Sequence, residues 1–208
     1  MSQYFRIHPD NPQPRLLKRA IEILRDDGVI VYPTDSCYAL GCRLDARGAH
    51  ERISRIRQVA PGHHFTLVCP DLSSIGTYAS VGNTEYRMLK ALTPGPFTFL
   101  LPATREVPRR LHNPKRRTIG LRVPQHPVVT GLLEMLGEPL LSCTLILPGD
   151  ELPLTEPEDI RERLEHHVDA VIDSGHCGLE PTTVIDMFEQ PPTVTRRGRG
   201  VERVDALL

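Results

Sequence analysis

The sequence lacks the features that mark a membrane or secreted protein. Its 208 residues contain no run of about 18 consecutive apolar side chains. The first residues, MSQYFRIHPD, have no apolar central segment and do not form a signal-peptide pattern. Five cysteines, an odd number with no Cys-x-x-Cys pair, argue against a disulfide framework or a zinc ribbon. We therefore expect a reducing, cytoplasmic location and no membrane partner.

The common motifs of enzyme chemistry are missing as well. The sequence has no Gly-x-x-x-x-Gly-Lys-Ser/Thr loop, no Gly-x-Gly-x-x-Gly after a strand, no His-Glu-x-x-His and no Gly-x-Ser-x-Gly. Two pairs of adjacent histidines, His63-His64 and His166-His167, are poor chelators because neighbouring side chains on a strand or helix point apart. We interpret them as surface or loop histidines and the cysteines as buried apolar residues, and we expect no metal site.

The net charge of -1 hides two segments of opposite charge. Residues 105–122 carry seven basic side chains and one acid, whereas residues 150–169 carry eight acids and two arginines. The acidic run is typical of a solvated face. The basic run suggests a surface or cavity that attracts anions such as phosphates.

Hydrophobic periodicity predicts helices that alternate with strands in the first half and adjacent strands in the second. Helices are expected over 14–28, 48–59, 84–92, 127–137 and 157–168, and strands over 29–32, 65–69, 93–103, 118–124, 139–147, 169–175, 181–187 and 193–198. Connections are short and no linker divides the chain. These patterns predict one α/β domain, residues 1–208, with a mixed parallel and antiparallel sheet.

Small polar side chains follow three of the predicted strands. They are Thr34-Asp35-Ser36, Ser142-Cys143-Thr144 and Thr182-Thr183. In α/β sheets, polar residues at strand ends often line the ligand crevice. Alternatively, Thr34-Asp35-Ser36 forms a turn that caps the next segment. The residues alone leave both interpretations open.

Six segments, in this order, resemble the YrdC/YciO family: VYPTDSCYALGC, RIRQ, TPGPFTFLLPA, TIGLRVPQHPV, GEPLLSCTLILPG and PTTVIDM…TRRG. The likeness runs from about Arg15 to Val201. The segments MSQYFRIHPDNPQ and RISRIRQVAPGHHFTLVCPDLS look closest to the YciO branch. The resemblance implies a twisted mixed sheet flanked by helices, with a basic cavity on one face.

Other members of this family are threonylcarbamoyl-AMP synthases. They join L-threonine, bicarbonate and ATP and release pyrophosphate, and the product is used to form N6-threonylcarbamoyladenosine in tRNA. The resemblance therefore implies ATP as a substrate, accompanied by Mg²⁺. One alternative is a non-catalytic module that binds double-stranded RNA, tRNA or rRNA, since members of the family have been described as binding double-stranded RNA and tRNA. A sensor of small molecules that has lost the chemistry is a third possibility.

The resemblance also implies roles for single residues. The candidate catalytic residues are Arg55 and Arg57, which match a Lys-x-Arg motif; the candidate substrate-binding residues are Thr34, Ser36, Arg122 and Thr182; the candidate nucleotide-binding residues are Ser142, Thr144 and Arg196. Guanidinium groups bind carboxylate and phosphate oxygens in pairs, and hydroxyls both donate and accept. All except Ser142 are expected to meet in one cavity.

Three departures from the synthase pattern bear on activity. Arg55 stands where synthases have Lys, and the loop QVAPGHH is about two residues longer than in typical members. Ile146 replaces an Asn that contacts the nucleotide in synthases. A lost polar contact costs about 1–3 kcal/mol of binding free energy, so we expect weak nucleotide binding and slow catalysis.

Overall fold

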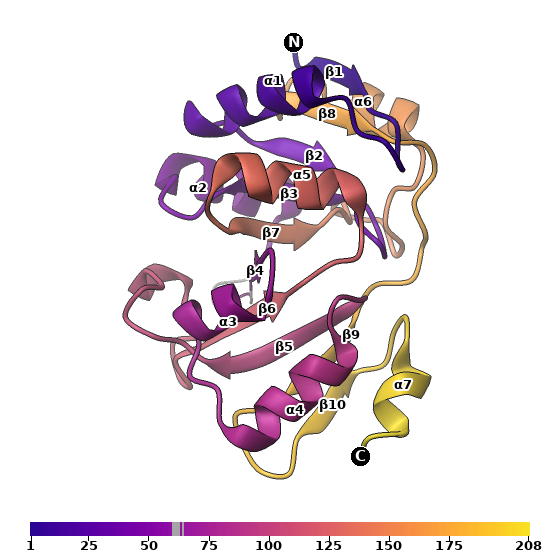
Figure 1. Ribbon diagram of the computed structural model, residues 1–208. Helices are drawn as coiled ribbons and strands as arrows, with labels where there is room; N and C mark the ends of the chain where they lie inside the picture. The colour runs from indigo at the N-terminus through magenta and orange to yellow at the C-terminus, as the bar shows by residue number, and fades with distance from the viewer. Residues whose placement is uncertain (60–62, 64) are drawn as a thin grey trace.

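The computed structural model describes residues 1–59, 63 and 65–208, so His64 and most of the long loop before β4 lie outside the described residues. Helices flank a long, twisted sheet whose strands succeed one another down the molecule (Figure 1). The described residues form ten strands in the order β1-β8-β2-β3-β7-β4-β6-β5-β9-β10. The sheet is continuous from the N-terminal edge strand to the C-terminal one. That residues 1–208 fold as one domain stays a prediction.

The described strands are β1 (Gln3–Arg6), β2 (Ile30–Tyr32), β3 (Ala39–Arg43), β4 (Thr66–Val68), β5 (Phe97–Pro102), β6 (Thr118–Arg122), β7 (Leu140–Thr144), β8 (Ala170–Asp173), β9 (Thr183–Asp186) and β10 (Thr193–Arg196). The described α-helices are α1 (Pro14–Arg25), α2 (Arg47–Arg57), α3 (Leu72–Tyr78), α4 (Asn83–Leu92), α5 (Pro127–Leu136), α6 (Pro157–Leu164) and α7 (Val201–Asp205). A short 3₁₀ turn covers Arg109–Leu111.

Strand pairing confirms the predicted mixed sheet. Pairs β1-β8, β2-β8, β4-β6 and β5-β9 are parallel. Pairs β2-β3, β3-β7, β4-β7, β5-β6 and β9-β10 are antiparallel. Helices in the chain separate many parallel partners, because a parallel pair needs a crossover connection.

Helices α1 and α5 lie side by side against the half of the sheet that contains β2 (Figure 1). Leu17 and Ile21 of α1 share a buried cluster with Leu132 of α5 and Ile30 of β2. The two helices approach closely because α5 carries Gly131, where an added Cβ would lie 2.6 Å from Leu17 Cδ1. A second cluster unites Ile53 of α2 and Ile160 of α6 with the sheet.

Alternate residues of the central strands have different surroundings. Leu67, Phe99 and Leu121 are buried in the second apolar cluster. Their neighbours Thr66 and Arg122 line a cavity instead. Because strand side chains alternate between faces, a sheet that is apolar on one face presents hydroxyls and a guanidinium on the other.

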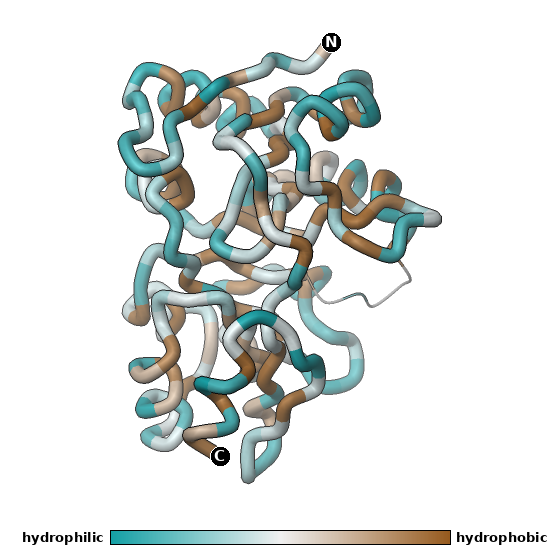
Figure 2. The backbone as a smooth tube through the Cα atoms, turned by 90° about the vertical axis from the view of Figure 1, so that its right-hand side faces the viewer, coloured by the Kyte–Doolittle hydropathy of each residue, from teal (hydrophilic) through white to brown (hydrophobic). Residues whose placement is uncertain are grey.

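Hydrophilic and hydrophobic stretches are interspersed along the described part of the chain (Figure 2). No helix within the described residues is long and apolar enough to cross a membrane.

Candidate functional site

A cavity of about 360 Å³ lies over the central and C-terminal strands of the sheet. Its polar lining consists of Ser36, Arg57, His63, Thr66, Thr98, Arg122, Ser142, Thr144, Thr182, Thr195 and Arg196, with the thiols of Cys37 and Cys143. Apolar side chains such as Ile146 and Leu100 complete the wall. A cavity rich in hydroxyls and guanidinium groups is suited to an anionic or zwitterionic ligand.

Most of the residues that the sequence placed in one cavity do meet there. Ser36, Arg57, Thr144, Thr182 and Arg196 line the cavity together with Arg122 and Ser142. Thr34 and Arg55 do not line it.

Thr34 forms the turn between β2 and β3. Its Oγ1 accepts hydrogen bonds from the backbone N–H groups of Ser36 and Cys37, both at 3.2 Å, and donates to the Cys37 carbonyl at 2.6 Å. Thr34 and Ser36 are both buried, and of the two only Ser36 lines the cavity. The turn interpretation is therefore confirmed for Thr34, and the same turn delivers Ser36 to the cavity.

Arg122 ends β6 and has a side chain only 8% exposed. Its Nη2 donates to Ser36 Oγ at 3.0 Å and Thr34 Oγ1 at 3.2 Å, and pairs with the Asp35 carboxylate. Its Nε is buried and has no hydrogen-bond partner in the described part of the chain. A buried donor without an acceptor is costly, so the described side chains do not satisfy this guanidinium completely.

Thr182 and Arg196 line another part of the same cavity. Arg196 Nη2 donates to Thr182 Oγ1 at 2.8 Å and its Nε to the Thr182 carbonyl at 2.9 Å. Thr98 Oγ1 lies 2.8 Å from Thr182 Oγ1. Burial lowers the pKa of Arg196, and the positive charge of Arg122 lowers it further. The two guanidinium groups thus repel each other, and an anion between them relieves that repulsion.

Arg57 reaches the cavity from the end of α2. Its Nε donates to Cys143 Sγ at 3.4 Å, and this sulfur lies 3.5 Å from His63 Nε2. Burial raises the pKa of the Cys143 thiol, although Arg57 opposes the shift, so the sulfur stays neutral near pH 7. The sequence did not predict His63 in the cavity; Thr66 and Thr98, also missed, were detectable as hydroxyls in apolar strands.

Arg55 lies on a different side of α2. Each residue of an α-helix turns about 100° around the axis, so positions i and i+2 are about 200° apart. Arg55 and Arg57 therefore face different ways. Arg55 lines a second cavity of about 820 Å³ with Arg52, Arg163 and His166. The prediction that Arg55 and Arg57 line the same cavity is therefore wrong, because the two side chains leave α2 in different directions.

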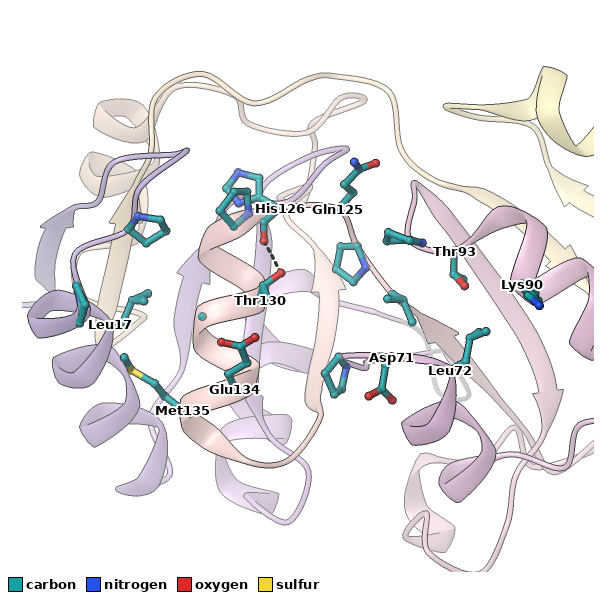
Figure 3. Close-up of a pocket in the computed structure, with 18 residues that line it drawn as sticks. Leu17, Asp71, Leu72, Lys90, Thr93, Gln125, His126, Thr130, Glu134 and Met135 are labelled. Carbon is teal, nitrogen blue, oxygen red and sulfur yellow. Dashed lines mark hydrogen bonds between the residues drawn. The ribbon is translucent and has the colours of Figure 1, made fainter.

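A third cavity, of about 730 Å³, lies between α1, α5 and the segments that lead to α3 and follow α4 (Figure 3). Prolines and scattered charges such as Lys90 and Glu134 line it. None of the predicted site residues lines this cavity, so it is not the site that the sequence indicated.

The described residues contain no group of three or more His, Cys, Asp or Glu side chains that could hold a metal ion. Any divalent ion at the cavity must therefore find oxygen ligands outside such a cluster, for example on a bound ligand.

The fold and cavity define an α/β protein with a cationic, hydroxyl-lined pocket, and comparisons identify its relatives. A family model named Sua5/YciO/YrdC and described as telomere recombination matches residues 22–198. YciO of Escherichia coli is 56% identical over 200 residues, covering 96% of this chain and 97% of that protein. The crystal structure of E. coli YciO has a TM-score of 0.94 over the same shares of the two chains. The chain belongs to the Sua5/YciO/YrdC family, which confirms the resemblance found in the sequence.

Two further relatives have informative names. A threonylcarbamoyl-AMP synthase of Chromobacterium violaceum is 39% identical over 146 residues, covering 69% of this chain and 74% of that protein. Sua5 of P. abyssi, crystallised with L-threonine, has a TM-score of 0.90 and 23% identity, covering 100% of this chain and 61% of that one. The likeness to Sua5 shows the shared fold.

Proposed function

We propose that the protein is a threonylcarbamoyl-AMP synthase-like enzyme of the YciO branch. It joins L-threonine, bicarbonate and ATP, and it acts in the pathway to N6-threonylcarbamoyladenosine in tRNA. In the reaction the threonine amine takes up bicarbonate to form a carbamate, with loss of water. A carbamate oxygen then attacks the α-phosphate of ATP, and the bond to pyrophosphate breaks.

The observation that carries the proposal is the buried guanidinium of Arg122 beside the cavity. Its Nε has no hydrogen-bond partner among the described residues, and Arg122 shares the cavity with Arg57 and Arg196. Such an array selects ligands with several anionic oxygens, which the threonine carboxylate and the triphosphate both supply. The synthase relative and the L-threonine complex of Sua5 support this choice of ligands.

We assign two sets of lining residues to different parts of the substrates. Ser36, Arg122 and Thr182 bind the amino acid, since their hydroxyls and guanidinium suit a zwitterion. Ser142, Thr144 and Arg196 bind the nucleotide. Mg²⁺ accompanies the triphosphate and is coordinated by phosphate oxygens and water. Catalysis of this kind needs positioning and charge neutralisation and no nucleophilic side chain.

The orientation of α2 suggests that the Lys-x-Arg motif should be aligned two residues further along the chain than the sequence comparison placed it. Arg57 lines the cavity and Arg55 does not, so Arg57 takes the position of the motif's Lys. Val59 then occupies the position of the motif's Arg. In this alignment one of the two motif cations is lost, which together with Ile146 leaves the nucleotide with fewer polar contacts and makes the reaction slow.

The test is pyrophosphate release from ATP and bicarbonate, measured with and without L-threonine. We expect slow release that depends on threonine and on Mg²⁺. Calorimetry with ATP, L-threonine and a short RNA duplex, each alone, accompanies the assay. If purified protein neither binds threonine nor releases pyrophosphate in its presence, the enzyme proposal is overturned.

Structured RNA is the second candidate ligand, and it is favoured by the exposed arginines between β5 and β6. Arg109, Lys115 and Arg117 are exposed and make no ion pair within the described residues. Arg116, by contrast, pairs with Asp186 at 2.7 Å, and Arg110 donates to the Leu44 carbonyl at 2.8 Å. Only part of the basic run is therefore free to meet phosphates.

A further inference from the structure

Asp35 contacts Arg122 from outside the cavity. Arg122 lines the cavity of about 360 Å³, whereas Asp35 lines a neighbouring cavity of about 490 Å³. The Asp35 side chain is 11% exposed, so its carboxylate is nearly buried beside the guanidinium. Asp35 therefore does not line the cavity of about 360 Å³ itself, and its ion-pair partner Arg122 does.

The two carboxylate oxygens of Asp35 have separate partners. Oδ1 accepts from Arg122 Nη2, and Oδ2 accepts from the backbone N–H of Gln125 at 2.9 Å. Asp35 thus joins the turn after β2 to the segment just beyond β6. Both the guanidinium and the backbone that follows it are fixed by one side chain.

This arrangement decides which edge of the guanidinium remains for a ligand. The bonds of Arg122 to Thr34, Asp35 and Ser36 all use Nη2, while Nε has no acceptor in the described part of the chain. We propose that Asp35 is a positioning residue, which holds Nη2 and so fixes the Arg122 guanidinium at the cavity wall, where it meets the threonine carboxylate. This inference rests on the proposed function, and it adds a residue that touches no substrate.

The chain offers a matched control in Asp186. Its Oδ2 accepts from Arg116 at 2.7 Å, and its Oδ1 accepts from the backbone N–H of Phe188 at 2.9 Å. It is also nearly buried, with a side chain 12% exposed. Asp186 does not line the cavity of about 360 Å³. The two aspartates therefore make the same kinds of bond and differ in whether their arginine reaches the cavity.

The experiment compares wild type with Asp35→Asn, Asp35→Glu and Asp186→Asn. Calorimetry gives the affinity for L-threonine, steady-state kinetics give separate KM values for threonine and ATP, and thermal unfolding gives stability. We expect Asp35→Asn to weaken threonine binding about tenfold and to raise the KM for threonine while the KM for ATP stays close to wild type. Asp186→Asn should change threonine affinity by less than about twofold, although both variants lose stability.

Asp35→Glu keeps the charge and moves it by one methylene, so it should bind threonine more weakly than wild type and more tightly than Asp35→Asn. It also supplies the comparison if Asp35→Asn does not fold. Equal threonine affinity in wild type and both Asp35 variants overturns this inference and leaves the proposed function intact. Failure of the wild type to bind threonine overturns the proposed function itself.

Discussion

Arg55 and Arg57 are two arginines of one helix that reach different cavities, which makes them a natural pair for mutation. Arg57→Ala removes a cation from the cavity that holds Arg122, and we expect threonine-dependent pyrophosphate release to fall by at least about tenfold. Arg55→Ala removes the same charge from the other side of α2, and the rate should stay within about twofold. Equal losses would show that the charge of α2 matters and that contact with the cavity does not.

Ile146 is one of the apolar side chains in the cavity wall, and it stands where synthases have a polar Asn. A polar edge of the nucleotide that faces it stays unpaired, which costs about 1–3 kcal/mol. Ile146→Asn should therefore raise the rate of pyrophosphate release and lower the KM for ATP. The control is Ile146→Leu, which keeps an apolar side chain and should leave both quantities near wild type. A rate that does not rise with Asn contradicts the proposed contact.

Much of the cavity could be predicted residue by residue, because a polar side chain at the end of an apolar strand is visible in sequence. This pattern marked Ser36 and Thr182 as candidates, and the family resemblance favoured the cavity over a turn. Thr34 belongs to the same pattern, yet its hydroxyl is used by the turn. The spacing of Arg55 and Arg57 on the expected helix already shows that they face different ways, but which of the two reaches the cavity could not be predicted, since sequence alone does not fix the rotation of α2 about its axis. His63 was missed because only tertiary structure brings it near Cys143.

The elements found from sequence are those with long periodic patterns or dense β-branched residues. Helices α1 and α5 bury four residues each, and their stripes were clear. Four elements were missed: β1, β3, α3 and α7. Helices α3 and α7 each bury one residue, Ile75 and Val204, too few to form a stripe. Strand β1 owes its conformation to pairing with β8, far along the chain.

The connection between β5 and β6 is the element that tests the RNA hypothesis. Its exposed cations Arg109, Lys115 and Arg117 should each release counterions if they contact phosphates. Replacing all three by Ala should flatten the dependence of RNA affinity on salt, measured by titrating a labelled duplex at several salt concentrations.

A control for the RNA experiment replaces Arg15, Lys18 and Arg87, three exposed cations elsewhere on the surface. The same change in net charge should leave the salt slope close to wild type. A slope that is unchanged in the β5-β6 variant, or changed equally in both, places the RNA surface elsewhere or removes it.

At the scale of the whole molecule, buried thiols and phenols make stability sensitive to alkali. All five cysteines are buried, as the sequence predicted. Burial raises the pKa of Cys42 and Cys69 from 9.0 to about 12, and that of Tyr32 from 10.0 to about 12. These groups ionise more readily in the unfolded chain. Their contribution to stability is complete below pH 9.0 and is lost as the pH rises toward about 12.

We therefore expect the urea midpoint of the reduced protein to fall steadily above pH 9, with little change between pH 7 and pH 8. The combined change Cys42→Ala and Cys69→Ala should make that fall shallower, because two of the buried ionisable groups are gone. If the urea midpoint falls as steeply with pH in this variant as in wild type, the proposed role of the two thiols is contradicted.

The pairing of β1 with β8 has a consequence for how the polypeptide acquires its structure as it leaves the ribosome. Gln3 pairs with Ala170 and Arg6 with Asp173, so the first strand made must wait for nearly the whole chain before its partner exists. Contacts between residues so far apart in the sequence slow folding, because a long loop must close, at a cost in entropy, before they can form. Until then the edge of β1 has no partner strand. We expect nascent chains that end before residue 170 to depend on chaperones far more than full-length ones.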